Sequence, residues 1–168
     1  MSTLNLKPNH APVKAYYEAL ERFGRGNFDN EGNIRGAFER LLEKCAHQFN
    51  WTIVPEYKIA RKGQHPAFVD AAAVDEFNLP RAYWEAKDSK DDLETEIRKK
   101  FQAGYPRTNI LFQSPARAIL YQNGTIAFDG DITKPEKIVD VLSLLFQYSE
   151  PHIQEWEDAV DEFLSRAE

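Results

Sequence analysis

The chain has 168 residues, of which 42% are hydrophobic, and a formal charge of −6. This length and composition indicate one folded domain with its own core and exclude a disordered chain. No stretch has the length and apolarity of a membrane span or an export signal, and the single cysteine, Cys45, has no internal partner for a disulfide. A soluble cytoplasmic protein is therefore expected.

The negative charge is concentrated at the C-terminal end of the sequence. Residues 150–168 contain seven acids and one base, whereas residues 1–149 contain twenty of each. The affinity of proteins for DNA comes largely from Lys and Arg side chains that contact phosphate. Residues 1–149 have zero net charge and lack the basic stripe of an independent DNA binder, so we expect any grip on DNA to come from elsewhere.

Hydrophobic periodicity and turn residues predict alternating helices and strands along the chain. The expected elements are helices at 11–22 and 34–49, strands at 51–60, 67–74 and 81–87, a helix from 92 to 103, a strand at 109–114, a hairpin over 117–130, and helices at 135–148 and 151–165. Ser89 and Asp92 have capping-box spacing at the start of the middle helix. This order predicts an α/β domain with a central mixed sheet flanked by helices.

The strand at 81–87 carries an acid and a lysine on one face. Side chains alternate across a strand, so Glu85 and Lys87 point the same way and Trp84 points the other way. In the preceding apolar strand, Asp70 needs a partner or a metal, because an isolated buried carboxylate is costly. If the two strands are neighbours, Asp70 and Glu85 converge at an edge of the sheet.

Two such carboxylates, together with the backbone carbonyl of Ala86, would suit Mg²⁺. The metal would lower the pKa of a bound water and neutralise charge on an attacked phosphate. Lys87 would hold the attacking water or stabilise the phosphate oxygens. A site with these groups would hydrolyse phosphodiester bonds. The alternative is a structural ion pair on a surface strand.

Other acids and acid–lysine pairs fit this pattern less well. Glu56–Lys58 comes before the acid strand, and Asp88–Lys90 lies on the opposite face with its lysine in the helix cap. Asp75 is a rival for the first acid, but its Asp-Glu-Phe-Asn context is typical of a connecting loop.

The order of helix, Asp, Glu-x-Lys, helix and strand resembles the PD-(D/E)XK nuclease superfamily. The longer stretch is most similar to the amino-terminal, Mrr-like nuclease domain of Type ISP and related restriction-modification enzymes. The residues that carry this resemblance are FVDAAAVDEFNLPRAYWEAKDSKDDLETEIRKKFQAGYPRTNILFQ and ILYQNG, within roughly residues 30–150. Val69-Asp70-Ala71 stands where the family usually has Pro-Asp-Gly.

The resemblance implies a restriction-endonuclease-like sheet, with Asp70 and Glu85 as ligands of Mg²⁺ or Mn²⁺ and Lys87 as the catalytic lysine. It implies double-stranded DNA as substrate and a prokaryotic cytoplasm. In that family the nuclease is joined to an ATP-driven helicase-like translocase, a methyltransferase and a target-recognition part. We therefore expect a helix and turn segment at 1–30, a nuclease core at 31–150, and an acidic helix at 151–168 that leads into a linker.

Four further residues are candidates for the same site. Glu39 lies on the long helix, from which superfamily members sometimes supply another acid, although a solvated helix acid is the alternative. Lys90 is a candidate phosphate contact, and Gln102 and Gln113 bracket the middle helix and the next strand. Residues 98–100 are expected to interact with the negative end of their own helix. A catalytically inactive fold that clamps DNA or docks between domains remains the alternative function.

Overall fold

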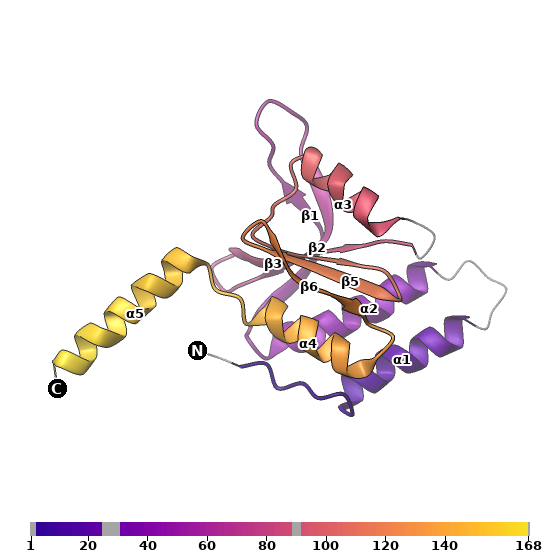
Figure 1. Ribbon diagram of the computed structural model, residues 1–168, viewed down its shortest axis with the longest axis horizontal. Helices are drawn as coiled ribbons and strands as arrows, with labels where there is room; N and C mark the ends of the chain where they lie inside the picture. The colour runs from indigo at the N-terminus through magenta and orange to yellow at the C-terminus, as the bar shows by residue number, and fades with distance from the viewer. Residues whose placement is uncertain (1–2, 25–30, 89–91, 168) are drawn as a thin grey trace.

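The computed structural model describes residues 3–24, 31–88 and 92–167 (Figure 1). The elements are α1 (Ala11–Gly24), α2 (Glu31–His47), β1 (Thr52–Ile59), β2 (Ala67–Val74), β3 (Pro80–Ala86), α3 (Leu93–Gln102), β4 (Asn109–Gln113), β5 (Arg117–Gln122), β6 (Thr125–Asp131), α4 (Pro135–Phe146) and α5 (Pro151–Arg166). Every helix and strand expected from the sequence is present. The proposed cap residue Ser89 lies outside the described residues, and α3 follows Asp92 as its N-cap.

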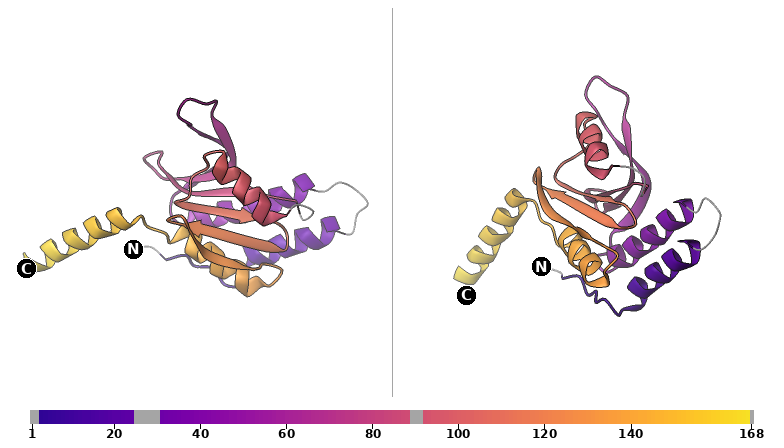
Figure 2. Two further views of the ribbon diagram at one scale, coloured as in Figure 1. Left: turned by 45° about the horizontal axis from the view of Figure 1, so that its top comes forward. Right: turned by 45° about the vertical axis from the view of Figure 1, so that its right-hand side comes forward.

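The six strands form one mixed sheet in the order β1-β2-β3-β4-β5-β6. Only β3 and β4 pair in parallel, and the other neighbours are antiparallel. A parallel pair needs a crossover connection, which α3 provides. The helix α3 covers one face of the sheet, whereas α2 and α4 cover the other and α1 packs outside α2 (Figure 2). The predicted α/β class, with a central mixed sheet flanked by helices, is confirmed.

The two faces of the sheet have separate cores. On the face of α2 and α4, Trp84 of β3 stacks on Phe38 of α2 with ring centroids 5.5 Å apart. On the opposite face, Leu93 and Ile97 of α3 pack over Phe112 of β4. The strand β3 therefore faces two different layers with alternate side chains, as its sequence predicts.

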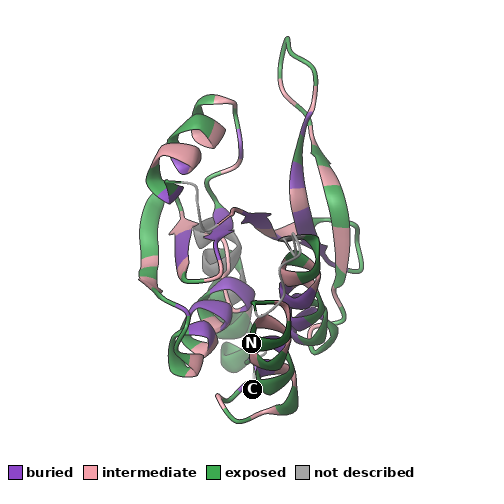
Figure 3. Cartoon of the chain, turned by 90° about the vertical axis from the view of Figure 1, so that its right-hand side faces the viewer, coloured by how far each residue is buried: buried purple, intermediate pink, exposed green. Residues whose placement is uncertain are grey.

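The hairpin of β1 and β2 changes its orientation part-way along its length. Ala71 packs in the core with α2, but Val69, two residues earlier on the same strand, packs beneath α3. The register with β1 is unbroken, and Glu56, opposite Asp70, has a positive φ of 49°. Such a φ is uncommon for a residue other than glycine. The ribbon thus turns over at Asp70, and its outer half extends beyond the sheet (Figure 3).

The last helix, α5, projects away from the sheet (Figure 1). Trp156, Phe163 and Leu164 on this helix are exposed. Among the described residues, no helix combines the length and apolarity needed to cross a membrane.

Candidate active site

Asp70 and Glu85 lie at the point where β2 and β3 separate. The last backbone pair at this end of the ladder is Ala71 with Trp84. Beyond it, the Glu85 carboxylate accepts a hydrogen bond from the N–H of Asp70 (3.0 Å), and the Asp70 carboxylate accepts one from the N–H of Ala86 (2.8 Å). The two acids replace the missing backbone bonds and are brought together between the separating strands.

Two lysines bind the second oxygen of Glu85. Lys100 Nζ of α3 lies 3.2 Å from Glu85 Oε2, and Lys87 Nζ lies 3.8 Å from the same atom. Lys87 also lies 3.7 Å from an oxygen of Glu96, on the first turn of α3. Glu85 is only 3% exposed, so its charge is compensated by these side chains rather than by bulk water.

The helix α2 approaches the site from the other face. Arg35 Nη1 lies 3.6 Å from the second oxygen of Asp70. Burial raises the pKa of Glu39, and the negative charges of Glu43 and Asp70 raise it further. Glu39 is thus within electrostatic reach of Asp70. No hydrogen bond or ion pair joins Glu39 to Asp70 or Glu85 in the described part of the chain.

The local electrostatics favour a cation between the two acids. Burial raises the pKa of Glu85, and the charge of Asp70 raises it further, while Lys100 and the N–H of Asp70 oppose the shift. The net pKa is above that of an ordinary glutamate. Burial lowers the pKa of Lys100, but the charge of Glu85 outweighs this and raises it, so Lys100 is a cation at neutral pH.

The donor set fits a hard divalent cation. Each carboxylate uses one oxygen to accept from a backbone N–H, and the other oxygen lies near the cationic end of a side chain, Arg35 for Asp70 and Lys100 for Glu85. Carboxylate and backbone oxygens are the ligands that Mg²⁺ prefers. In the part of the chain that the structure describes, no three His, Cys, Asp or Glu side chains gather into a metal cluster. Asp70 and Glu85 would therefore supply two ligands, and water, substrate or the carbonyl of Ala86 would complete the shell.

Gln113 supports the end of β3. Its backbone carbonyl accepts from the N–H of Lys87 (2.7 Å), and its side-chain oxygen accepts from the indole N–H of Trp84 (3.1 Å). Gln113 is buried and its amide N–H₂ donates to the carbonyl of Ser114. Gln113 thereby positions the backbone on both sides of Glu85.

The other supporting candidates lie elsewhere. Gln102 is exposed on α3 and lines a hollow of about 530 Å³ together with Arg98, Phe101 and Arg107 and with residues of β5 and β6. Lys90 lies outside the described residues, so its predicted phosphate contact stays a prediction.

The rival acid Asp75 has a role in a turn. Its carboxylate accepts from the N–H groups of Phe77 and Leu79 and from Arg81, at the opposite end of β2 from Asp70. Burial raises the pKa of Asp75, but these donors outweigh burial and lower it. Asp75 therefore closes the β2–β3 turn.

Sequence reasoning missed Lys100, which was expected to interact with the end of its own helix. Lys100 instead pairs with Glu85, and its Nζ lies 3.4 Å from the hydroxyl of Tyr105. The helical periodicity of the sequence does indicate this position, because Leu93, Ile97 and Lys100 are spaced four and three residues apart and so lie on one face of the helix. A lysine on the buried stripe of a helix faces the sheet rather than water.

The fold of this chain is similar to that of a known protein. No family model and no curated protein matches the chain. The structure is similar to a chain in the cryo-EM structure of a DrdV–DNA complex, with a TM-score of 0.82 and 33% sequence identity. The expected fold is confirmed: this is a restriction-endonuclease-like α/β domain. The match covers 90% of this chain and 15% of the other chain, so the chain spans a small part of the protein that it resembles.

Proposed function

We propose that the chain is a metal-dependent DNA endonuclease domain that hydrolyses phosphodiester bonds. The observation that carries this proposal is the meeting of Asp70 and Glu85 between the separating ends of β2 and β3, with two lysines on Glu85. The similarity to a protein that was solved in complex with DNA supports DNA as the substrate. The resemblance of the sequence to the PD-(D/E)XK superfamily supports the same chemistry.

In this mechanism, Asp70, Glu85 and the carbonyl of Ala86 would hold Mg²⁺, or Mn²⁺ in its place. The bound ion would supply Lewis-acid chemistry at the scissile phosphate. The ammonium group of Lys87 lies beside Glu85 and would bind an attacking water or a phosphate oxygen. Lys100 favours the ionised form of Glu85, since its positive charge opposes the rise in the pKa of that carboxyl.

We further propose that this domain is the cleavage module of a larger restriction-modification enzyme of the Type ISP kind. The chain corresponds to 15% of the DrdV chain, which leaves room there for other domains. A translocase, a methyltransferase and a target-recognition domain would then deliver the nuclease to its DNA. The domain itself would cut without recognising sequence.

One observation favours the alternative of an inactive nuclease-like fold that clamps DNA or docks between domains. Arg35, Lys87 and Lys100 already neutralise the two acids, and both acids bind backbone N–H groups. An ion-pair cluster that merely supports the fold has these same properties. Metal binding separates the two functions, because only the nuclease requires it.

The test is the variant Glu85→Gln, whose side-chain oxygen can still accept from the N–H of Asp70. Nicking of supercoiled plasmid with Mg²⁺ or Mn²⁺ is expected to fall to background, and calorimetry is expected to show loss of Mn²⁺ binding. The matched control is Glu76→Gln, an exposed acid in the β2–β3 turn, which should retain both. Nicking that persists in Glu85→Gln would move the catalytic site elsewhere. A wild-type chain that binds DNA but neither Mn²⁺ nor Mg²⁺ would support the clamping function.

A further inference from the structure

Two segments far apart in the sequence carry Lys and Arg residues but no acid. Residues 57–69 form the outer part of the β1–β2 hairpin, and residues 97–108 form the second half of α3 and the loop after it. Together they hold seven Lys and Arg residues and no Asp or Glu, while the rest of the chain holds fourteen Lys and Arg and all twenty-seven Asp and Glu. The basic residues are Lys58, Arg61, Lys62, Arg98, Lys99, Lys100 and Arg107. We call these two segments the basic surface.

The two segments are in contact. Arg61 of the hairpin donates a hydrogen bond to the carbonyl of Ala103 at the end of α3 (2.9 Å). Tyr105 donates one to the carbonyl of Phe68 on β2 (2.7 Å). Figure 1 shows the hairpin next to α3. The fold therefore brings two basic segments that are far apart in the sequence into contact.

Most of this charge is available to a ligand. Lys58, Lys62, Arg98 and Arg107 are exposed, and none of them forms an ion pair with a residue that the structure describes. The guanidinium of Arg107 stacks on the ring of Phe101 at 4.5 Å, which leaves its N–H groups free of any carboxylate partner in that part of the chain. These side chains can exchange condensed counterions for phosphate contacts.

The basic surface begins at the candidate active site. Lys100 is its innermost cation and contacts Glu85, and the β2 strand of the hairpin leads directly into Asp70. A polyanion that lies along the hairpin and α3 would therefore have its backbone next to the two acids. The rest of the chain has an excess of acids, which disfavours binding of the same polyanion elsewhere.

We propose that the basic surface binds the phosphate backbone of duplex DNA and holds it against the candidate active site. This inference rests on the proposed nuclease function. It would allow a chain whose first 149 residues have no net charge to bind DNA, since two segments without acids are in contact. This domain would then contribute to DNA affinity, as would any domains joined to it.

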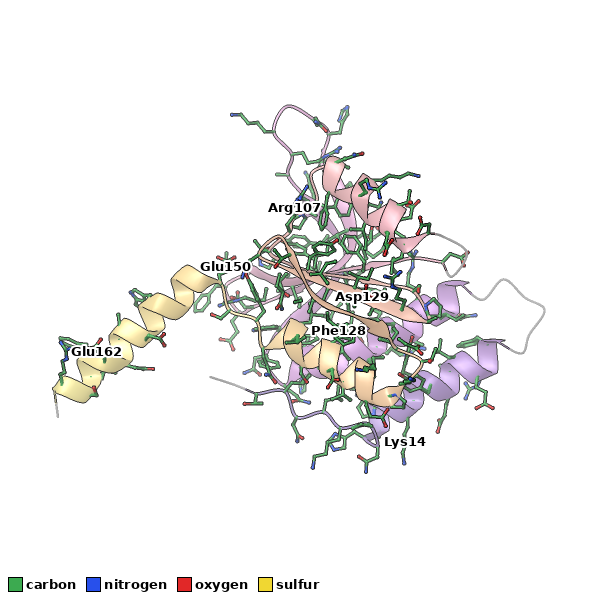
Figure 4. The ribbon with its side chains drawn as sticks, viewed as in Figure 1. Lys14, Arg107, Phe128, Asp129, Glu150 and Glu162 are labelled. Carbon is green, nitrogen blue, oxygen red and sulfur yellow. The ribbon has the colours of Figure 1, made fainter. Side chains whose placement is uncertain are left out.

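The test measures binding of a short fluorescein-labelled DNA duplex by anisotropy in EDTA, so that cleavage plays no part. The surface variant carries Lys58→Gln, Lys62→Gln, Arg98→Gln and Arg107→Gln. Arg61 and Lys100 are kept, because they make contacts within the fold. The control variant carries Lys7→Gln, Lys14→Gln, Lys134→Gln and Lys137→Gln, which are exposed residues with the same total charge. Figure 4 shows Lys14 at the bottom of the view, away from Arg107.

The salt dependence of the binding constant gives the number of phosphate contacts, at about 0.9 in the log–log slope for each. Between about 50 and 200 mM salt, we expect the slope of the surface variant to be less steep by about 3 to 4, and that of the control to match wild type. The inference is overturned if the control loses as much affinity as the surface variant, if the surface variant binds like wild type, or if RNA duplex binds more tightly than DNA.

The two proposals fail in different ways. If the chain binds DNA through this surface but neither wild type nor Glu85→Gln nicks it, the proposed nuclease function is contradicted and the proposed DNA-binding surface is supported. If wild type nicks DNA and the surface variant nicks and binds as well as wild type, the surface fails and the nuclease stands.

Discussion

The variant Trp84→Phe tests how the fold holds the candidate site. Trp84 is 3% exposed, stacks on Phe38, and donates from its indole nitrogen to the side-chain oxygen of Gln113. The smaller ring leaves a cavity, which costs about 1 to 2 kcal/mol when the surroundings relax only partly. The buried oxygen of Gln113 loses its donor, which costs about 1 to 3 kcal/mol. We expect a total loss of about 2 to 5 kcal/mol in the free energy of unfolding.

The assay is urea unfolding followed by far-ultraviolet circular dichroism, because tryptophan fluorescence would change with the substitution itself. The matched control is Trp156→Phe on α5, where the side chain is 68% exposed and the expected change is below about 0.5 kcal/mol. The double variant Trp84→Phe/Gln113→Leu should lose less than the sum of its single variants, because the pair is coupled. A loss below about 0.5 kcal/mol in Trp84→Phe would refute this account of the core.

Three further outcomes follow from the geometry. Because the pKa of Glu85 is raised, protons should compete with Mn²⁺ at a higher pH than they would at an ordinary glutamate. In Lys100→Met, the pH at which the calorimetric Mn²⁺ affinity falls should be higher still, and an unchanged pH profile would contradict the role of Lys100. Tyr105→Phe removes the bond to the carbonyl of Phe68 and should cost about 0.5 to 1.5 kcal/mol in urea unfolding, with no loss as the contrary result. Asp75→Ala should destabilise the fold by about 1 to 3 kcal/mol yet leave plasmid nicking intact well below its melting temperature, whereas lost nicking would favour Asp75 as the first acid.

Local signals in the sequence were sufficient to predict the helices and strands. The Asn-Gly pair that predicts a tight hairpin is Asn123-Gly124, and both residues have the positive φ that such a turn requires. The stripe of α2 reaches the core, as Phe38 and Leu42 show. These features depend on residues close together in the chain, so that periodicity and turn chemistry define them.

The surroundings of the two acids could not be predicted in the same way. Arg35 and Lys100 reach the acids from helices on opposite faces of the sheet, and their positions depend on how those helices pack. The reversal of the hairpin at Asp70 was equally hidden, because a strand pattern assumes uniform alternation of its side chains. The basic surface was concealed for a related reason, since a sum of charges over residues 1–149 says nothing about which segments become neighbours.

One strand connects the hairpin to the candidate site. The eight residues of β2 run from the outer half of the hairpin through Asp70 to the centre of the sheet without an intervening loop. The outer half of the hairpin and the candidate site therefore share one strand, and a displacement of the hairpin would act on the backbone of Asp70 directly. If the hairpin binds DNA as proposed, that contact and the position of the Asp70 carboxylate would be coupled through a single strand.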